Sequence, residues 1–410
     1  MTEEIAVLAG ITSGKINNEF SDEATMDELS ELAKTAGATV VAQVLQPKDA
    51  PDVATYLGSG KLEELKFLCE NNDANLVIFD DELTGSQQKN IENAVGVRVI
   101  DRSTLILDIF ASRAMSKEGK LQVELAQLKY MLPRLTGMGQ ALSRLGGGIG
   151  TRGPGETKLE SDKRHIRTRI SRLLSELKEV ELRRGYARQR RKKDNVLTVS
   201  LVGYTNAGKS TLMNRLTDAG VLAENKLFAT LDTTSRALTL PDDREVLLID
   251  TVGFIRKLPH HLINAFKSTL EEAVFADVIL NVIDYSNPEH KIHLTVANDI
   301  LMSLGVTKTP IINVYNKCDL AESTYKPDEN NIYVSAETGE GLEELLKLIA
   351  TKIPYPYKRM ELLIPYDKTG FASSVRADGK LISEEYGENG IKIVADIEGK
   401  AVHKYEQFGI

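Results

Sequence analysis

The chain has 410 residues, enough for two to four domains, and its hydrophobic content of 42% supports ordinary buried cores despite a formal net charge of −8. No apolar stretch approaches membrane-spanning length, and the N-terminus lacks the basic start and apolar block of a secretory signal, so we expect a cytoplasmic protein without stable membrane insertion. The two cysteines, Cys69 and Cys318, lie far apart without metal-ligand spacing, which fits a reducing compartment.

The first 115 residues alternate short β-branched segments with amphipathic ones, which predicts a compact parallel α/β domain at 1–115. Strands are predicted at 5–9, 39–45, 75–79 and 97–100, and helices near 26–35, 60–71, 87–95 and 104–114. The stretch Gly58-Ser-Gly-Lys61 looks like a phosphate loop. Thr55 stands where that loop needs glycine, and Leu62 stands where it needs Ser or Thr. Helix initiation is therefore the favoured interpretation, with a second nucleotide site as the alternative.

Two heptad patterns follow, which predict an antiparallel helical hairpin, a short coiled coil, over 116–194. The first helix carries leucines spaced 4-3-4, and the second carries apolar residues spaced 4-3-4-3. These residues are Leu121, Leu125, Leu128 and Leu132, then Ile166, Ile170, Leu173, Leu177 and Val180. The predicted tip, 137–155, contains eight glycines together with Arg144, Arg152 and Pro154. This composition favours close approach to a phosphate backbone over a passive linker.

The second helix of the hairpin is strongly basic. Residues 163–193 contain 13 Lys or Arg against three Glu, a net charge of +10, so the rest of the chain carries −18. This asymmetry predicts an anionic partner such as RNA, with Arg183, Arg184, Arg188 and Arg190 as candidate contacts. A solvated helix face remains the alternative.

A GTP-binding domain is predicted at 195–355, and its first motif is a phosphate loop. An apolar strand at 196–202 ends in Gly-Tyr-Thr-Asn-Ala-Gly-Lys-Ser, which opens a helix. The loop's backbone N–H groups can cradle phosphates, a lysine can reach the β- and γ-phosphates, and a serine hydroxyl can bind Mg²⁺. The predicted nucleotide-binding residues here are Gly203, Tyr204, Thr205, Asn206, Ala207, Gly208, Lys209 and Ser210.

Two further strand ends carry the remaining motifs. The strand 246–250 ends in Asp-Thr-Val-Gly, which predicts metal binding through water by Asp250 and a γ-phosphate contact from the Gly253 N–H, with Thr251 and Val252 between them. The strand 311–315 ends in Asn316-Lys317-Cys318-Asp319, whose final carboxylate can accept two N–H bonds from guanine. Ser335 and Ala336 are predicted to face the guanine carbonyl. Residues 356–410 predict a small α+β domain with a helix near 400–407, without assigned chemistry.

The order of these parts resembles the HflX family of translational GTPases, within the Obg-HflX superfamily. The resemblance covers nearly the whole chain, and its most specific element is the glycine-rich run at 146–160. Further matching stretches are 56–62, 203–211, 227–232, 250–254 and 316–319. The family implies a cytoplasmic, Mg²⁺-dependent enzyme that converts GTP to GDP and phosphate and binds the large ribosomal subunit and its RNA. The implied role is splitting or rescuing ribosomes, or subunit biogenesis. The N-terminal domain and hairpin are the expected contacts of a monomer.

Switch I is assigned by the resemblance. Thr230, Thr233 and Thr234 each offer a hydroxyl, but Phe-Ala-Thr at 228–230 is similar to Phe-Thr-Thr in relatives such as Obg, which favours Thr230 as the Mg²⁺ ligand over Thr233. The switch I residues assigned to the nucleotide are Phe228, Ala229, Thr230, Leu231 and Asp232. The predicted metal ligands are Ser210, Thr230 and Asp250, and the predicted catalytic residues are Lys209, Thr230 and Gly253.

One departure from Ras-like enzymes has a mechanistic consequence. Phe254 occupies the position of the water-orienting glutamine, so hydrolysis by the isolated protein should be slow, with stimulation by the ribosome. Asn206 matches GTPases that use K⁺ as an additional positive charge, which makes K⁺ a candidate second cofactor beside Mg²⁺. A local loop hydrogen bond is the alternative for this side chain. The competing function is a GTP-dependent switch acting on a protein partner, with the basic hairpin as a solvated spacer.

Overall fold

The computed structural model forms two compact units, Met1–Ala350 and Thr351–Ile410, each considered by itself. Among the described residues, no helix combines the length and the apolar character needed to cross a membrane. The residues that the structure describes are 3–12, 22–135, 158–217, 227–228, 233–257, 272–321, 327–353, 357–399 and 401–410.

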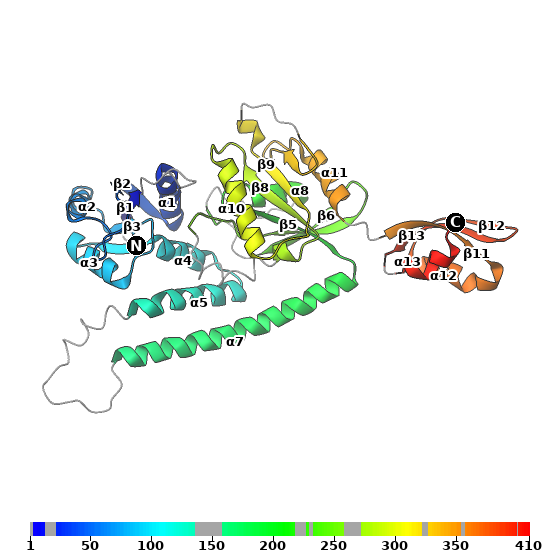
Figure 1. Ribbon diagram of the computed structural model, residues 1–410, viewed down its shortest axis with the longest axis horizontal. Helices are drawn as coiled ribbons and strands as arrows, with labels where there is room; N and C mark the ends of the chain where they lie inside the picture. Colours follow the sequence, from blue (N-terminus) through cyan, green and yellow to red (C-terminus); the bar gives the residue numbers. More distant parts are fainter. Residues whose placement is uncertain are drawn as a thin grey trace. The chain divides into compact units, whose positions relative to one another are not determined.

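The N-terminal part of the first unit is built on a four-stranded parallel sheet in the order β2-β1-β3-β4 (Figure 1). Its strands are β1 (Glu4–Thr12), β2 (Ala38–Pro47), β3 (Leu76–Phe79) and β4 (Arg98–Asp101). Its helices are α1 (Asp22–Ala36), α2 (Ser59–Asn71), α3 (Gly85–Val95) and α4 (Arg102–Arg113). The predicted alternation is confirmed. Gly58 is the residue before α2, with φ −69°, which agrees with helix initiation there.

Local sequence explains these elements. Every residue of β3 is buried, because both faces of the sheet are covered and its Leu-Val-Ile-Phe run packs on two sides. Helix α3 begins at a capping box, in which Thr84 accepts a hydrogen bond from the Gln87 N–H and the Gln87 side chain bonds back. It ends at Gly96, whose φ of 77° is readily adopted only by a residue without a Cβ atom.

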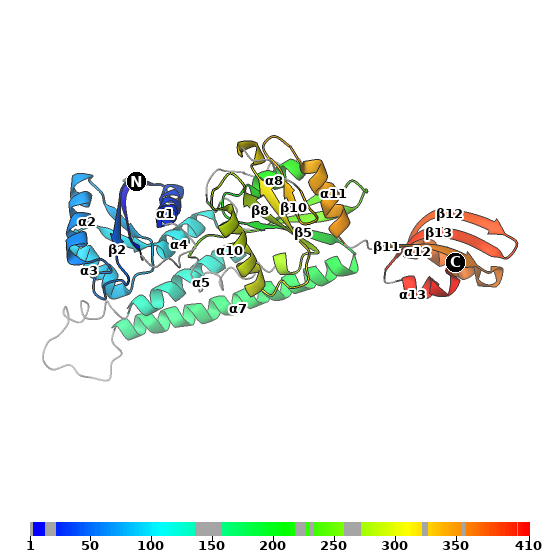
Figure 2. The same cartoon turned by 45° about the horizontal axis from the view of Figure 1, so that its top comes forward.

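Helices α5 (Lys117–Arg134) and α7 (Lys158–Lys193) lie side by side, as Figures 1 and 2 show. The predicted seam residues Leu121 and Leu125 pack on Leu173, with Leu128, Ile170 and Leu177 beside them. Arg169 adds a bidentate bond to Glu124 at 2.6 and 2.7 Å across the seam. The predicted pairing of the two heptad patterns is confirmed. The predicted glycine-rich tip, 137–155, lies outside the described residues.

A six-stranded sheet in the order β10-β9-β8-β5-β7-β6 follows, and only β6 is antiparallel to its neighbour. The predicted mainly parallel sheet is therefore confirmed. Helix α10 packs on β5 and β8, while α8 packs on β5, β6 and β7. The elements are β5 (Leu197–Gly203), α8 (Lys209–Thr217), β6 (Thr234–Thr239), β7 (Glu245–Asp250), β8 (Val278–Asp284), α10 (His290–Ser303), β9 (Ile311–Asn316), η2 (Cys318–Leu320), β10 (Asn331–Tyr333) and α11 (Leu342–Lys352).

The second unit is an antiparallel sheet in the order β11-β13-β12 with short helices. Its elements are β11 (Tyr357–Ile364), η3 (Tyr366–Lys368), α12 (Thr369–Asp378), β12 (Gly379–Gly387), β13 (Gly390–Glu398), α13 (Val402–Tyr405) and η4 (Glu406–Phe408). Sequence reasoning missed α12, because its Ser- and Gly-containing sequence has weak helix propensity. Its helical conformation is instead stabilised by packing of Ala372 and Val375 in the core.

Within the first unit, one apolar cluster joins the N-terminal sheet and its helices to segments around β6 and β7 of the second sheet. Phe110 of α4 packs edge-to-face against Phe228, with ring centroids 4.6 Å apart. Val252 and Ile255, which follow β7, belong to the same cluster. This cluster therefore places α4 against segments that flank the predicted phosphate site.

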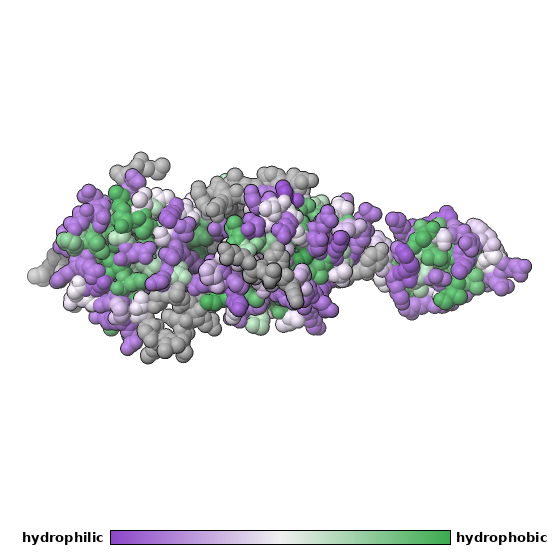
Figure 3. Space-filling model, turned by 90° about the horizontal axis from the view of Figure 1, so that it is seen from above, coloured by the Kyte–Doolittle hydropathy of each residue, from purple (hydrophilic) through white to green (hydrophobic). Residues whose placement is uncertain are grey.

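On the face shown in Figure 3, hydrophilic and apolar side chains are interspersed over the described surface.

Candidate nucleotide-binding site

The carboxyl ends of β5, β7, β9 and β10 carry the predicted motifs. Parallel strands end at one edge of a sheet, so residues far apart in the sequence meet there. The segment after β7 pairs with the start of the phosphate loop: the Phe254 N–H donates to the Gly203 carbonyl at 3.0 Å, and the Thr205 N–H donates to the Phe254 carbonyl at 2.8 Å. These two bonds hold the first and second motifs side by side.

Two features explain why position 208 is a glycine. Its φ of 92° disfavours any side chain, and a Cβ there would lie 2.2 Å from the Asn316 Nδ2. The same Nδ2 donates to the Ala207 carbonyl at 2.9 Å, while the Asn316 Oδ1 accepts from the Ala336 N–H at 2.9 Å. One buried asparagine therefore ties the phosphate loop to the two motifs assigned to the base.

Lys209, Thr205 and Gly253 converge at one point. A Cβ built on Gly253 would lie 2.8 Å from the Thr205 Cγ2 and 2.9 Å from the Lys209 Nζ. The lysine ammonium donates to the carbonyls of Gly203 and Tyr204 at 3.0 and 2.8 Å. Burial lowers the pKa of Lys209 to about 8, because the charged form loses its hydration, although Asp250 opposes this shift. This geometry brings Gly253 and the Lys209 ammonium, the two groups assigned to the γ-phosphate, close together.

The residues assigned to the metal fit a magnesium ion. The Ser210 hydroxyl donates to the Asp250 Oδ2 at 2.7 Å, so a hydroxyl and a carboxylate meet at the strand edge. Mg²⁺ prefers oxygen ligands and keeps several waters and phosphate oxygens, so it needs few protein ligands. No cluster of three or more His, Cys, Asp or Glu that could hold a metal ion forms among the described residues. Thr251 is oriented by its hydroxyl, which donates to the Leu201 carbonyl at 2.7 Å, and Val252 is buried beside it.

The residues assigned to the base gather around η2. Lys317 adopts φ 64°, and its ammonium bonds Asp284 at 2.6 Å. Cys318 is buried, with its N–H bonded to the Val334 carbonyl at 3.2 Å, and this contact leaves Asp319 exposed at the start of the turn. Ser335 and Ala336 are buried next to this turn.

The described residues leave two of the site assignments untested. Residues 229–232, with Thr230 among them, lie outside the described residues, whereas Thr233 is described and half-buried just before β6. The choice between Thr230 and Thr233 thus stays a prediction. Asn206 is exposed with φ 61°, and nothing in the described residues adds support for K⁺ there.

Phe254 is 1% exposed and packs among apolar residues of β5 and α10, so its ring faces the core rather than the phosphate.

Sequence reasoning missed a cavity of about 470 Å³ beside the phosphate loop. It is lined by Thr205 and Asn206 of the loop, by Glu28 of α1, and by Arg256 and His293. The sequence signal for this cavity was Arg256, a basic residue close to the Asp-Thr-Val-Gly motif. The acidic residues that pair with Arg256, Glu28 and Glu289, lie in other parts of the chain.

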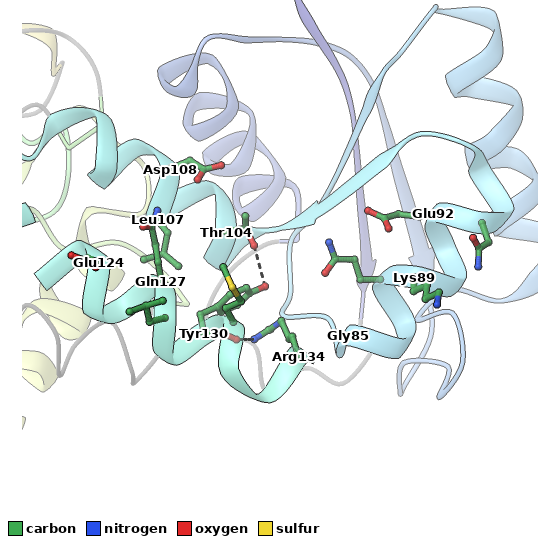
Figure 4. A pocket seen from close by; sticks show the side chains of 14 residues that line it. Gly85, Lys89, Glu92, Thr104, Leu107, Asp108, Glu124, Gln127, Tyr130 and Arg134 are labelled. Atoms are coloured by element: carbon green, nitrogen blue, oxygen red, sulfur yellow. Dashed lines mark hydrogen bonds between the residues drawn. The ribbon is translucent and has the colours of Figure 1, made fainter. Parts of the chain in front are cut away.

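A second cavity, of about 620 Å³, lies between α3, α4 and α5 (Figure 4). Tyr130 bonds Thr104 at its wall, and the Arg134 guanidinium stacks 3.3 Å from the Tyr130 ring centroid. Arg134 also donates to Asp101, so the side chains of Tyr130 and Arg134 are both already engaged in contacts within the protein. Residues 58–61, the stretch that looks like a phosphate loop, do not line this cavity.

Known proteins show the same arrangement. Three family models match in chain order: an N-terminal region of GTP-binding GTPases at 23–111, their middle region at 113–191, and a model described as a 50S ribosome-binding GTPase at 198–317. GTPase HflX of Caldanaerobacter subterraneus subsp. tengcongensis is 54% identical over 395 residues, covering 96% of this chain and 91% of the relative. GTPase HflX of Escherichia coli K12 is 42% identical over 357 residues, covering 84% of each.

A solved GTP-binding protein from Sulfolobus solfataricus, in complex with GDP, is 27% identical and covers 85% of this chain and 98% of its own. Its TM-score is 0.46, so the fold assignment rests on the sheet topology given above. The identities over nearly the whole chain, together with the phosphate-loop geometry, settle the family. This chain belongs to the HflX family of GTPases, binds guanine nucleotides and hydrolyses GTP.

Proposed function

We propose that this GTPase binds the large ribosomal subunit in the cytoplasm and uses GTP in splitting ribosomes, rescuing stalled ones or assembling the subunit. The observation that carries the proposal is a row of exposed basic residues along α7, in a chain whose net charge is negative. The family model described as a 50S ribosome-binding GTPase supports the same partner. Ribosomal RNA is the polyanion that such a surface fits.

The basic residues of α7 fall into two groups. Arg184 bonds Glu118 of α5 at 3.0 Å, and Arg188 and Arg191 both bond Glu272 at 3.1 Å. These three arginines stabilise the protein itself, so Arg184 and Arg188 are poor candidates for the RNA contacts expected from the sequence. The exposed group comprises Arg164, Arg167, Arg172, Lys178, Arg183, Arg190 and Lys193, of which Arg172 and Arg190 also pair with the acidic residue four positions further along the chain. The proposed RNA surface is this exposed group.

The alternative is a GTP-dependent switch acting on a protein partner, in which the hairpin is a spacer. The internal ion pairs of Arg184, Arg188 and Arg191 favour it, since they show that part of the +10 charge of residues 163–193 serves the fold. Co-sedimentation with ribosomal subunits, with and without a non-hydrolysable GTP analogue, separates the two. GTP-dependent association with the large subunit supports the proposal, whereas no association under either condition contradicts it.

We expect substitution of the exposed arginines to flatten the salt dependence of ribosome binding. In a variant with Arg167→Gln, Arg183→Gln and Arg190→Gln, the slope of log affinity against log salt should fall by about one for each replaced arginine that binds a phosphate. The double variant Arg184→Gln and Arg188→Gln is the matched control. It should lower the melting temperature and leave the slope nearly unchanged. Equal effects of both variants on the slope would contradict the assignment of the RNA surface.

For the nucleotide site we propose that Ser210 and Thr230 hold Mg²⁺, that Asp250 binds it through water, and that Lys209 and Gly253 contact the γ-phosphate. The convergence of Lys209, Thr205 and Gly253, and the 2.7 Å contact of Ser210 with Asp250, support these roles. When bound, the ion would neutralise charge on the phosphate oxygens.

Thr230→Ala should slow GTP hydrolysis by about tenfold or more while GDP affinity stays near that of the parent, because switch I closes on the metal only when a γ-phosphate is present. Single-turnover hydrolysis and titration with a fluorescent GDP analogue measure the two effects. Thr233→Ala is the control, and a larger loss of hydrolysis in that variant would transfer the switch role to Thr233.

A further inference from the structure

Arg256 lies three residues beyond Gly253 and is 5% exposed, which is unusual for an arginine. It lines the 470 Å³ cavity together with Thr205 and Asn206 of the phosphate loop and with several acidic side chains of α1 and of the segment around the start of α10. The Thr205 Cγ2 would lie 2.8 Å from a Cβ at Gly253, the glycine assigned to the γ-phosphate. The guanidinium therefore lies in a cavity that reaches the phosphate loop.

Three side chains hold Arg256 in its present position. Its Nη2 donates to Glu289 at the start of α10 and lies 3.2 Å from the His293 Nε2. Its Nε lies 3.7 Å from the Glu28 Oε2 on α1. Burial beside Arg256 lowers the pKa of His293 to about 4, so this imidazole is neutral and accepts a hydrogen bond from the arginine. The guanidinium is thus restrained by two carboxylates and one imidazole.

Glu28 is the group that joins this arginine to the phosphate loop. It accepts a hydrogen bond from the Tyr204 hydroxyl at 2.8 Å and pairs with the buried Arg102 of α4. Tyr204 in turn stacks on His293, with ring centroids 4.0 Å apart. Although burial acts to lower the pKa of Arg256, its contacts with Glu289 and Glu28 hold that pKa above the ordinary value, so the side chain is charged throughout.

We propose that Arg256 is the residue that supplies positive charge to the γ-phosphoryl group during hydrolysis, and that Glu28 and Glu289 hold it away until the site is activated. The proposal fills a chemical gap, because the buried Phe254 can neither orient water nor stabilise charge. It concerns hydrolysis itself and stands whether or not the ribosome is the partner.

In this reaction the oxygen of water forms a bond to the γ-phosphorus, and the bond from that phosphorus to the β–γ bridging oxygen breaks. The products are GDP and inorganic phosphate, and the protons of the water end on phosphate and solvent. Arg256 keeps its proton and donates hydrogen bonds to the oxygens on which negative charge builds up. An arginine in this position gives large rate gains, because the charge it meets is greatest in the transition state.

The neighbouring residue indicates how the restraint is anchored. Lys257 bonds Asp80 and, at 2.7 Å, Asp81 at the carboxyl end of β3, so the backbone next to Arg256 is pinned to the N-terminal sheet. In this proposal the Arg256 side chain turns from its carboxylates toward the phosphate oxygens while the backbone beside it stays pinned. Loss of the Glu28 charge should therefore weaken the restraint on the arginine, although Glu289 and His293 still contact it.

The test measures single-turnover GTP hydrolysis by the full chain without ribosomes. Glu28→Gln should raise the rate about tenfold, since an arginine supplied within the chain accelerates related enzymes by that order or more. Glu64→Gln, on α2 and bonded to Lys61, removes the same charge at an exposed position outside the cavity and should leave the rate unchanged. GDP affinity should stay constant in both variants.

The arginine itself is then tested in the activated background. Adding Arg256→Lys to Glu28→Gln should abolish the gain in rate while GDP affinity is retained, because an ammonium cannot donate two parallel bonds. A double variant as fast as Glu28→Gln alone would overturn the proposal, as would a Glu28→Gln protein that is folded and no faster than the parent.

A second measurement distinguishes a missing guanidinium group from a loss of folding. In Arg256→Ala, guanidinium chloride at non-denaturing concentration should restore hydrolysis severalfold, whereas tetramethylammonium chloride at the same concentration should not. The unmodified protein should respond to neither salt. Equal responses of Arg256→Ala to the two salts would exclude a role for the guanidinium group in the reaction.

Discussion

Asp319→Asn should exchange a preference for guanine nucleotides for a preference for xanthine nucleotides. Asp319 is exposed in the middle of η2, next to the turn that Lys317 makes at φ 64°. The amide presents a donor where the guanine N–H groups need an acceptor, whereas a xanthine oxygen can accept from it. Losing this charge-assisted pair should cost about 2–3 kcal/mol, or about a hundredfold in affinity.

Competition of GTP and XTP against a fluorescent nucleotide measures this exchange. Asp243→Asn, in the turn between β6 and β7, makes the same chemical change at an exposed position outside the four motifs. That control should bind GTP like the parent. An Asp319→Asn protein with unaltered affinity for GTP would show that another residue reads the base.

Asn316→Ala should weaken binding of both GTP and GDP by one to three orders of magnitude, about 2–4 kcal/mol. This side chain makes two buried hydrogen bonds, to the Ala207 carbonyl and from the Ala336 N–H, and it fills the space that Gly208 leaves open. Its removal leaves two backbone groups unsatisfied in the interior and separates the phosphate loop from the base-binding turns. Unlike Asp319→Asn, this substitution should not change which base is preferred.

Asn313→Ala is the matched control for Asn316→Ala, because it lies on the same strand and bonds Asn331 instead of the phosphate loop. Isothermal titration with GDP, alongside thermal unfolding of each variant, separates weaker binding from lower stability. If Asn313→Ala weakened GDP binding as much as Asn316→Ala, the effect would come from damage to β9, and the proposed link between motifs would fail.

The sequence by itself determined the features that depend on near neighbours in the chain. A run of apolar residues followed by Gly-Tyr-Thr-Asn-Ala-Gly-Lys-Ser predicts a strand, a phosphate loop and a helix, because backbone turns and helix initiation depend on a few adjacent residues. Heptad spacing likewise predicted which leucines of α5 and α7 meet, since both sides of that seam are periodic. Because all strands of the GTPase sheet but β6 are parallel, the order of motifs also implied a common edge.

Only the tertiary structure decided which charges serve the fold and which remain exposed. Arg184 and Arg183 are adjacent in one basic helix, yet Arg184 bonds Glu118 whereas Arg183 is exposed. The contact between Tyr204 and Glu28 joins residues 176 positions apart, and Arg256 depends on the same carboxylate. No local periodicity encodes such pairs, because an ion pair needs only one atom of each partner within reach. Their positions follow from how α1 and the segment after β7 pack, which is set by the shared apolar core.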